Sequence, residues 1–354
     1  MLVVLAILAL GVLVVVHEAG HYFVARWSKM RVERFSIGFG PAVLKWRSGE
    51  TQFQLAPVPF GGFVQITGMN PHEEFDEKDP HVYPNRPAIL RFLVILAGPA
   101  MNYVLSVLII FVFYLSAGVD QEVARWKVTT VEADKPAAGL LQQGDRLLRV
   151  NGVEVWNSRS DLPDFATEVQ KGGGKPITIT VERAGKVMEV KLTPRLEPPP
   201  ADAAKGAEKS YRVGVRIDAE RKPVGVATAA GLAIVYPVEK TQQILSNLYL
   251  VITRKAPGGL TGPVGIVNAM QEQFSYGWAQ ALQLVATLSV MLGLFNLLPI
   301  PGLDGGRLAF LGYELATRRR PNPKVEATVH MFGILILFLV LIVVTFKDIK
   351  NLFI

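Results

Sequence analysis

The chain of 354 residues contains no cysteine. This excludes disulfide bonds, thiolate metal ligands and cysteine nucleophiles, and it leaves the redox compartment of the protein undecided. Any metal ion must therefore be held by histidine, aspartate or glutamate. Histidine is itself scarce, with five residues in the chain, so the motifs that contain it carry much of the chemical information.

Charge is also scarce. Charged residues make up 19% of the chain, whereas hydrophobic residues make up 50% and the mean hydropathy is +0.30. A soluble domain is seldom so apolar unless it carries membrane spans. The net charge is +7, but no basic stripe with interleaved aromatic residues is present, and the basic residues lie mostly beside apolar runs. The composition argues against nucleic-acid binding and favours contact with a lipid bilayer.

Four segments are long and apolar enough to cross a bilayer. They cover about residues 1–26, 90–117, 279–298 and 329–346. The first has no basic region before it and no small-residue cleavage site after it, so we expect a retained span rather than a signal peptide. A short helix is expected near 305–317, after the third span.

Positive charges beside these spans predict their orientation. Basic residues follow the first span, precede the second and separate the third from the fourth, which is one side of the membrane if the spans alternate. These residues are Arg26, Lys29, Arg31, Arg34, Lys45, Arg47, Arg86, Arg91, Arg318, Arg319, Arg320 and Lys324. That side is expected to be the cytoplasm, so both termini and the long segment between the second and third spans face outward.

The motif His17-Glu18-Ala19-Gly20-His21 follows the uncharged run of residues 1–16. In a helix, residues four apart lie on one face, so His17 and His21 can share one metal ion. HExxH on a helix is typical of zinc hydrolases that use the glutamate as general base. The alternative, unliganded histidines near the membrane boundary, leaves polar side chains without partners in apolar surroundings. We therefore predict a Zn²⁺ site with Glu18 as a catalytic residue.

A catalytic zinc ion usually has a third protein ligand. The better candidate is Asp304, in the segment NLLPIPGLDGG at 296–306, where Pro299 and Pro301 must break the helix. Broken helix within a membrane is tolerated where it lines a cavity, and a carboxylate placed there needs a cation to stay charged. His330, at the start of the fourth span, is less suitable, because a lone histidine there is more often an interfacial residue.

Residues 34–66 alternate and turn like strands, with a Ser-Gly turn signal at 48–49. We predict a membrane-associated β-hairpin close to the catalytic face, whose edge could pair with an extended substrate. The pattern fits a plain surface hairpin equally well. The acidic, proline-rich residues 70–87 contain His72 and His81, and here a solvated loop is favoured over a second metal site.

Residues 119–218 form a separate module with nearly balanced charges and short apolar runs. It resembles a bacterial PDZ domain in the stretches Pro136-Ala-Ala-Gly-Leu140, Gly144-Asp-Arg-Leu147 and Asn151-Gly152. The resemblance implies that the module binds extended peptides, often C-terminal tails, as an added strand. Tyr211–Ile217 is the candidate for the carboxylate loop and its strand. A helix is expected near 158–170, followed by two strands around an Ala-Gly turn at 184–185.

Residues 226–253 are predicted to be helical, with a break at Pro237. Ile244, Leu248 and Val251 share one face of this helix. Such a face can lie along the membrane surface or pack on neighbouring helices, and the pattern favours neither.

The two chemical motifs together resemble those of the site-2 protease family of intramembrane zinc metalloproteases. HEAGH and NLLPIPGLDGG match the HExxH and NxxPxPxLDG patterns of that family. The resemblance implies that His17, His21 and Asp304 bind zinc, that Glu18 is the catalytic glutamate, and that Asn296 helps to hold the substrate or the oxyanion. With a PDZ module after the second span, the arrangement resembles the RseP group of bacterial proteases. It departs from that group in size, because the best-known members carry two PDZ modules and one is predicted in this chain.

Two further segments agree with this family. They are Ala-Gly-Pro-Ala-Met-Asn at 97–102 and Gly-Pro-Val-Gly at 262–265. For Asn102 we favour a helix-packing amide beside small residues over a catalytic role.

The resemblance implies cleavage of the transmembrane segments of single-pass membrane proteins, such as anti-sigma factors or remnant signal peptides. The site is expected near the cytoplasmic face of the bacterial inner membrane, with the PDZ module in the periplasm as a tail reader or size filter. One alternative is a catalytically silent PDZ scaffold or adaptor with a structural metal, which would not need Glu18. A zinc transporter is disfavoured, because the second to fourth spans contain few polar residues.

The predicted fold is a polytopic α-helical membrane protein with four transmembrane helices, a membrane-associated β-hairpin and an inserted α+β PDZ domain. The predicted boundaries are 1–28 for the first span, 29–87 for the hairpin and acidic loop, 88–117 for the second span, 118–218 for the PDZ domain, 219–278 for the amphipathic helix and GPVG loop, 279–318 for the third span with the LDG motif, and 319–354 for the fourth span and C-terminus.

Overall fold

The computed structural model describes residues 1–70, 73–76, 78–121, 123–158, 162–198, 209–253 and 262–352. The chain divides into two compact units. The first, called the helical unit below, consists of Met1–Val112 and Ala230–Ile354, and the second, called the inserted unit, is Phe113–Ala229.

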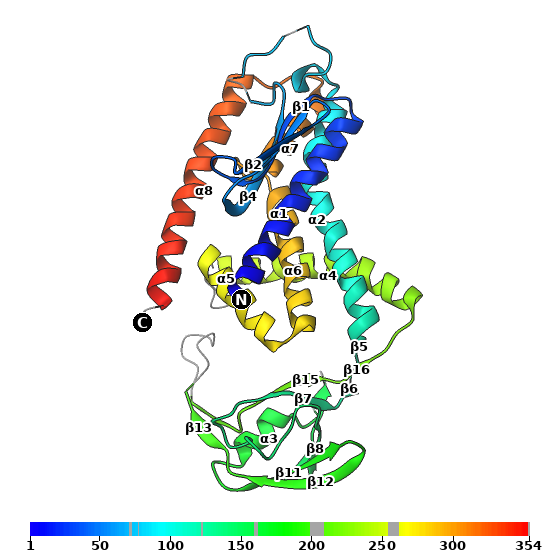
Figure 1. Cartoon of the computed structure of the whole chain (residues 1–354), viewed down its shortest axis with the longest axis vertical. Helices are drawn as coiled ribbons and strands as arrows, with labels where there is room; N and C mark the ends of the chain where they lie inside the picture. Colours follow the sequence, from blue (N-terminus) through cyan, green and yellow to red (C-terminus); the bar gives the residue numbers. More distant parts are fainter. Residues whose placement is uncertain are drawn as a thin grey trace. The chain divides into compact units, whose positions relative to one another are not determined.

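The helical unit contains helices that are long and apolar enough to cross a membrane (Figure 1). Within the described residues there are four of them: α1 (Leu2–Trp27), α2 (Ala88–Ala117), α6 (Trp278–Leu297) and α8 (Pro323–Leu352). The four predicted spans are thus confirmed as helices, and the predicted short helix is α7 (Asp304–Thr317).

The fourth helix begins earlier than predicted, at Pro323 instead of residue 329. Hydropathy marks only the apolar part of a helix, whereas the backbone begins where a capping signal allows it. Pro323 occupies the first turn, where its missing N–H is not needed, and the Asn322 side chain accepts a hydrogen bond from the Lys324 N–H at 2.9 Å.

The predicted hairpin at 34–66 is a four-stranded sheet instead. Its strands are β1 (Val32–Phe39), β2 (Leu44–Ser48), β3 (Thr51–Leu55) and β4 (Val58–Ile66), in the order β2-β3-β1-β4. Only β2 and β3 form the hairpin around residues 48–49, while β1 pairs with β3 in parallel and with β4 in antiparallel orientation. The ring centroids of Phe35 and Phe53 each lie 5.6 Å from the ring centroid of Tyr22 in α1. Two strands alone seldom form a stable sheet, and this packing holds four together against the helix.

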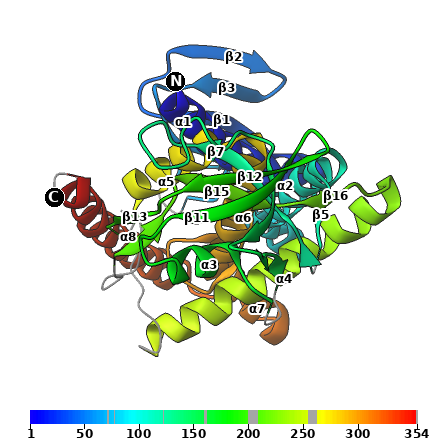
Figure 2. The same ribbon diagram turned by 90° about the horizontal axis from the view of Figure 1, so that it is seen from below.

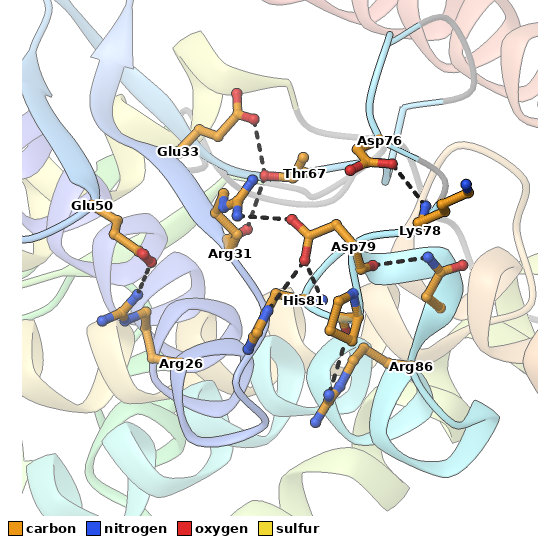
Figure 3. Close-up of polar contacts among 12 residues, drawn as sticks. Arg26, Arg31, Glu33, Glu50, Thr67, Asp76, Lys78, Asp79, His81 and Arg86 are labelled. Atoms are coloured by element: carbon orange, nitrogen blue, oxygen red, sulfur yellow. Dashed lines mark hydrogen bonds and ion pairs between the residues drawn. The ribbon is translucent and has the colours of Figure 1, made fainter.

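Charged contacts tie the loop after this sheet to residues 28–31, the connection between α1 and β1 (Figure 3). Asp79 accepts hydrogen bonds from Arg31 at 2.8 Å and from His81, whose Nδ1 lies at 3.1 Å, and Arg86 donates to the Ser28 carbonyl at 2.7 Å. His81 is exposed and is not part of any metal-binding cluster of the described residues. His72 lies outside those residues.

Helix α4 (Val226–Ile252) is continuous, so the predicted break at Pro237 is wrong. It lies crosswise to α2 and α6 (Figures 1 and 2). On the two sides of the proline, the Tyr236 hydroxyl lies 2.8 Å from the Thr287 hydroxyl, and the Thr241 hydroxyl lies 3.0 Å from that of Tyr103. Pro237 has no N–H, so one backbone hydrogen bond of the helix is missing there. The contacts with α6 and α2 stabilise the helix on both sides of this point.

Residues 262–265, predicted as a loop, form the N-cap and the first turn of helix α5 (Pro263–Tyr276). Pro263 is compatible with this position because the first helical N–H groups have no partner within the helix. The Asp348 carboxylate of α8 accepts a hydrogen bond from the Gly265 N–H at 2.9 Å. A side chain far away in the sequence therefore caps this helix.

The inserted unit is built around a sheet with strand order β12-β11-β8-β7-β15, with β9 paired to β8. Alternate strand residues point into one apolar core, in which Leu147, Ile179 and Val181 are fully buried. The elements are β5 (Val119–Asp120), β6 (Val123–Ala124), β7 (Trp126–Val131), β8 (Arg146–Val150), β9 (Val153–Glu154), β10 (Asn157–Ser158), α3 (Phe165–Lys171), β11 (Ile177–Arg183), β12 (Lys186–Leu192), β13 (Arg195–Glu197), β14 (Ser210–Arg212), β15 (Val215–Ala219) and β16 (Arg221–Lys222).

Two features of this unit differ from prediction. The helix expected near 158–170 is shorter, because Asp164 caps it by accepting a hydrogen bond from the Ala166 N–H at 3.0 Å and Pro163 precedes the cap. The unit also extends beyond 118–218. Its two ends are joined where β16 pairs with β5, with Arg221 donating to Asp120 at 2.9 Å.

A buried ion pair stabilises this core, and its removal gives a first testable prediction. The Asp145 side chain is fully buried and accepts hydrogen bonds from the Arg183 guanidinium at 2.6 and 2.7 Å. Burial alone would raise the pKa of Asp145, but the bonds from Arg183 and from the Gln142 N–H outweigh it and hold that pKa below its ordinary value. We expect Arg183→Met to destabilise the inserted unit by about 3 kcal/mol at neutral pH, because it leaves a buried carboxylate unpaired.

Hydrogen-exchange mass spectrometry of the full chain, read on peptides from β8 and β11, measures this effect. Because the folded pKa of Asp145 is lowered, its stabilisation is complete above the unfolded pKa and is lost as the pH falls through the folded value. The difference between variant and parent should therefore narrow below about pH 4. The control is Arg149→Met at the exposed pair with Glu154, expected to cost less than about 1 kcal/mol. Equal effects of the two substitutions would contradict the prediction.

Candidate metal centre

Two histidines on helix α1 form one side of the candidate site. His17 and His21 are both buried, and their rings lie edge to face with centroids 4.9 Å apart. Their Nε2 atoms are separated by 3.2 Å. The helical spacing of four residues thus brings both nitrogens to one point, as the sequence predicted.

Asp304 completes the group from helix α7. One of its carboxylate oxygens lies 3.0 Å from the His17 Nε2 and 3.4 Å from the His21 Nε2. Within the described residues, these three side chains are the group of metal-ligating type whose donor atoms all lie within 4.8 Å of one another.

The backbone around Asp304 explains how the carboxylate reaches this point. Helix α6 ends at Leu297, and the chain then turns sharply through Gly302, which has φ +94°. A Cβ at Gly305 would lie 1.9 Å from the Leu298 carbonyl oxygen. Only glycine allows so close an approach of α7 to the preceding loop, so this residue places Asp304 at the first position of the helix.

The donor atoms fit a zinc ion. A tetrahedral ion with bonds of 2.0–2.1 Å to nitrogen and oxygen has ligand atoms separated by about 3.3 Å. The three separations here are 3.0, 3.2 and 3.4 Å. Two neutral imidazoles and one carboxylate would leave a fourth position open for water, as in catalytic zinc sites.

The second nitrogen of each imidazole is held by helix α2. His21 Nδ1 lies 2.8 Å from the Val94 carbonyl oxygen, and His17 Nδ1 lies 3.0 Å from the Asn102 side-chain nitrogen. Asn102 is fully buried, and in the described part of the chain its Oδ1 has no hydrogen-bond partner. Rotation of this amide by 180° would let Oδ1 accept the Nδ1–H of His17, which leaves Nε2 free for a metal.

The sequence pattern favours a packing role for Asn102, whereas the structure places its amide against His17. The pattern does not predict this contact, because the partner of Asn102 depends on how α2 packs on α1. Gly98, one helical turn earlier, permits this packing, since a Cβ there would lie 2.3 Å from the His21 Nε2.

Glu18 is turned towards the sheet. Its Cγ lies 3.5 Å from the position that a Cβ on Gly62 of β4 would occupy. Glu18 and the edge strand of the sheet therefore lie side by side next to the two histidines. This arrangement is suited to proton transfer to and from a group bound along β4.

Asn296 is not drawn into this cluster. Its amide donates a hydrogen bond to the Leu292 carbonyl of its own helix at 3.0 Å. The role that the family resemblance implies for Asn296 stays a prediction.

Known proteins are similar in sequence to this chain over almost its whole length. The model of peptidase family M50 matches residues 5–340. A protein of Clostridium acetobutylicum named as a zinc metalloprotease is 30% identical over 98% of this chain and 97% of its own length. One from Mesorhizobium japonicum is 34% identical over 92% of both chains. The zinc metalloprotease RasP of Oceanobacillus iheyensis is 28% identical over 99% of both. The expected zinc cofactor is thereby confirmed.

Proposed function

Because the chain belongs to peptidase family M50, the site-2 protease family, we propose that it is an intramembrane zinc endopeptidase that cleaves transmembrane segments of single-pass membrane proteins. The observation that carries this proposal is the position of the three converging side chains His17, His21 and Asp304, called the donor triangle below. His17 and His21 lie on a helix that is long and apolar enough to cross a membrane, and Asp304 follows another such helix. Ionisable residues in such segments are costly and are usually functional.

In this proposal His17, His21 and Asp304 bind the zinc ion. When bound, zinc supplies Lewis acidity that activates water and polarises the scissile carbonyl. Glu18 takes a proton from the attacking water and delivers it to the leaving amine nitrogen. Asn296 would support the substrate or its oxyanion once its amide leaves the Leu292 carbonyl.

The substrate is proposed to bind along β4. This strand lies at the edge of the sheet and next to Glu18, so its outer edge can pair with an extended segment. A transmembrane helix hides its amides in its own hydrogen bonds, and it must therefore unwind locally before it can pair and be cut. Anti-sigma factors and remnant signal peptides are the proposed substrate classes.

The remaining features of the proposal concern location and the inserted unit. We propose that the site lies near the cytoplasmic face of a bacterial inner membrane, with both termini and the inserted unit in the periplasm, and the basic residues beside the spans support this orientation. We assign a PDZ-like role to the inserted unit. Support comes from β15 (Val215–Ala219), which lies at the edge of its sheet, where a peptide tail could pair.

The proposal is tested by chelation of the purified full-length protein in detergent with a single-span reporter. We expect a zinc chelator to abolish cleavage and added Zn²⁺ to restore it, since the three side chains cannot activate water alone. Mass spectrometry of the products should place the cut within the apolar segment of the reporter. A chelator-resistant activity, or a cut confined to the soluble part, would refute the proposal. Zinc binding without any cleavage would favour the alternative, a scaffold with a structural metal.

A further inference from the structure

His330 of helix α8 makes a contact that the proposed chemistry does not use. The side chain is buried, and its Nδ1 accepts a hydrogen bond from the Gly302 N–H at 3.0 Å. Gly302 lies two residues before Asp304, in the loop that follows α6. Because Nδ1 is the acceptor, the proton of the neutral imidazole is on Nε2.

The ring is wedged between this loop and helix α7. A Cβ on Gly306 would lie 3.0 Å from the His330 Cε1, and the ring of Phe310 lies with its centroid 5.8 Å from that of His330. One turn further along α8, a Cβ on Gly333 would lie 2.1 Å from the Pro301 carbonyl oxygen. Helix α8 therefore packs directly on the loop that leads to Asp304.

The loop needs such an external partner. Pro299 and Pro301 have no N–H, and the amides of Ile300 and Leu303 are bonded within the loop, to Leu298 and Ile300. The Gly302 N–H instead points to another helix, where an unpaired amide in apolar surroundings would be costly. His330 is thus the side chain that fixes the orientation of this peptide group.

The second ring nitrogen of His330 is energetically unfavourable in this position. Nε2 is buried and has no hydrogen-bond partner in the part of the protein that the structure describes. A buried donor without a partner destabilises the folded protein, because the N–H gives up its hydrogen bond to water and gains none in exchange. An apolar residue would fill the same space without that cost, so the acceptor at Nδ1 is the property that distinguishes histidine here.

We propose that His330 is a positioning residue for Asp304. By accepting the Gly302 N–H, it holds the loop in the one orientation that directs the Asp304 carboxylate to His17 and His21. It is neither the metal ligand nor the interfacial residue that the sequence analysis considered. The inference rests on the proposed assignment of Asp304 as a zinc ligand.

Two amide substitutions at His330 separate the effect of the hydrogen-bond acceptor from the effect of side-chain volume. His330→Asn keeps an oxygen at the δ position of the side chain, whereas His330→Gln has the amide carbon there, which accepts no hydrogen bond, and carries its oxygen one bond further out. We expect the Gln variant to bind zinc about 10–100-fold more weakly than the parent and the Asn variant to stay within about threefold, because positioning contacts of metal ligands have effects of this size. Zinc affinity is measured by competition with a chelator on the purified full-length protein.

A background substitution distinguishes positioning from a general structural role. In Asp304→Ala, the His330→Gln change should cause no further loss of zinc affinity, because the ligand that His330 positions is absent. Equal losses in the Asn and Gln variants, or a full further loss in the Asp304→Ala background, would overturn the inference. If Asp304→Ala alone binds zinc as tightly as the parent, the ligand assignment and the proposed function fail instead.

Discussion

Glu18→Gln is expected to lower the rate of reporter cleavage by about 10²–10⁴-fold while the protein keeps its zinc. The amide has nearly the shape of the carboxylate, but it cannot take a proton from water. Glu18 is not among the three side chains whose donor atoms converge, so its replacement leaves the donor triangle intact. A purified sample of the variant should therefore lose cleavage activity while its zinc content stays equal to that of the parent.

The matched control for this prediction is Glu50→Gln. Glu50 pairs with Arg26 at 3.1 Å at the exposed rim of the helical unit, and its side chain is 63% exposed. That variant should cleave within about twofold of the parent, since exposed ion pairs contribute little. Undiminished cleavage by Glu18→Gln would remove the protease assignment from this site. An inactive variant with zinc bound would also serve to trap substrates in native membranes for identification by mass spectrometry.

The second large effect is expected from Gly98→Ala, the addition of one methyl group in the middle of helix α2. That group would lie 2.3 Å from the His21 Nε2 and 2.9 Å from the His17 Nε2, so both imidazoles or the helix must move. A displacement of about 1 Å at reacting groups can cost about 100-fold in rate. We expect cleavage to fall by at least about that factor and zinc affinity to fall with it.

Gly312→Ala in helix α7 is the control for the same substitution. Among the described residues, no atom outside the neighbouring helical backbone lies within 4 Å of a Cβ at this position. The change should therefore leave cleavage unaltered and stabilise the helix by about 0.5–1 kcal/mol. Cleavage rate and zinc stoichiometry of both variants provide the comparison. A fully active Gly98→Ala enzyme would mean that α1 and α2 are not as close during catalysis as they are in this structure.

Features that depend on local pattern were predictable from the sequence. Apolar length identified the four spans, and the four-residue spacing of His17 and His21 required only a helix. Asp304 could be selected because few other side chains were suitable once cysteine was absent. Predictions that needed knowledge of packing were wrong: Pro237 does not break its helix, and residues 34–66 form a sheet of four strands, because contacts with α1, α2 and α6 decide both.

The sequence alone therefore determined the membrane helices, the family, the zinc cofactor and the candidate ligands His17, His21 and Asp304, because each follows from residue type and short-range spacing. Only the tertiary structure showed that Asn102 contacts His17, that Gly98 makes room for both imidazoles and that His330 holds the loop before Asp304. These three contacts join helices that are distant along the chain. Their partners depend on how the helices pack, which no local pattern of residues specifies.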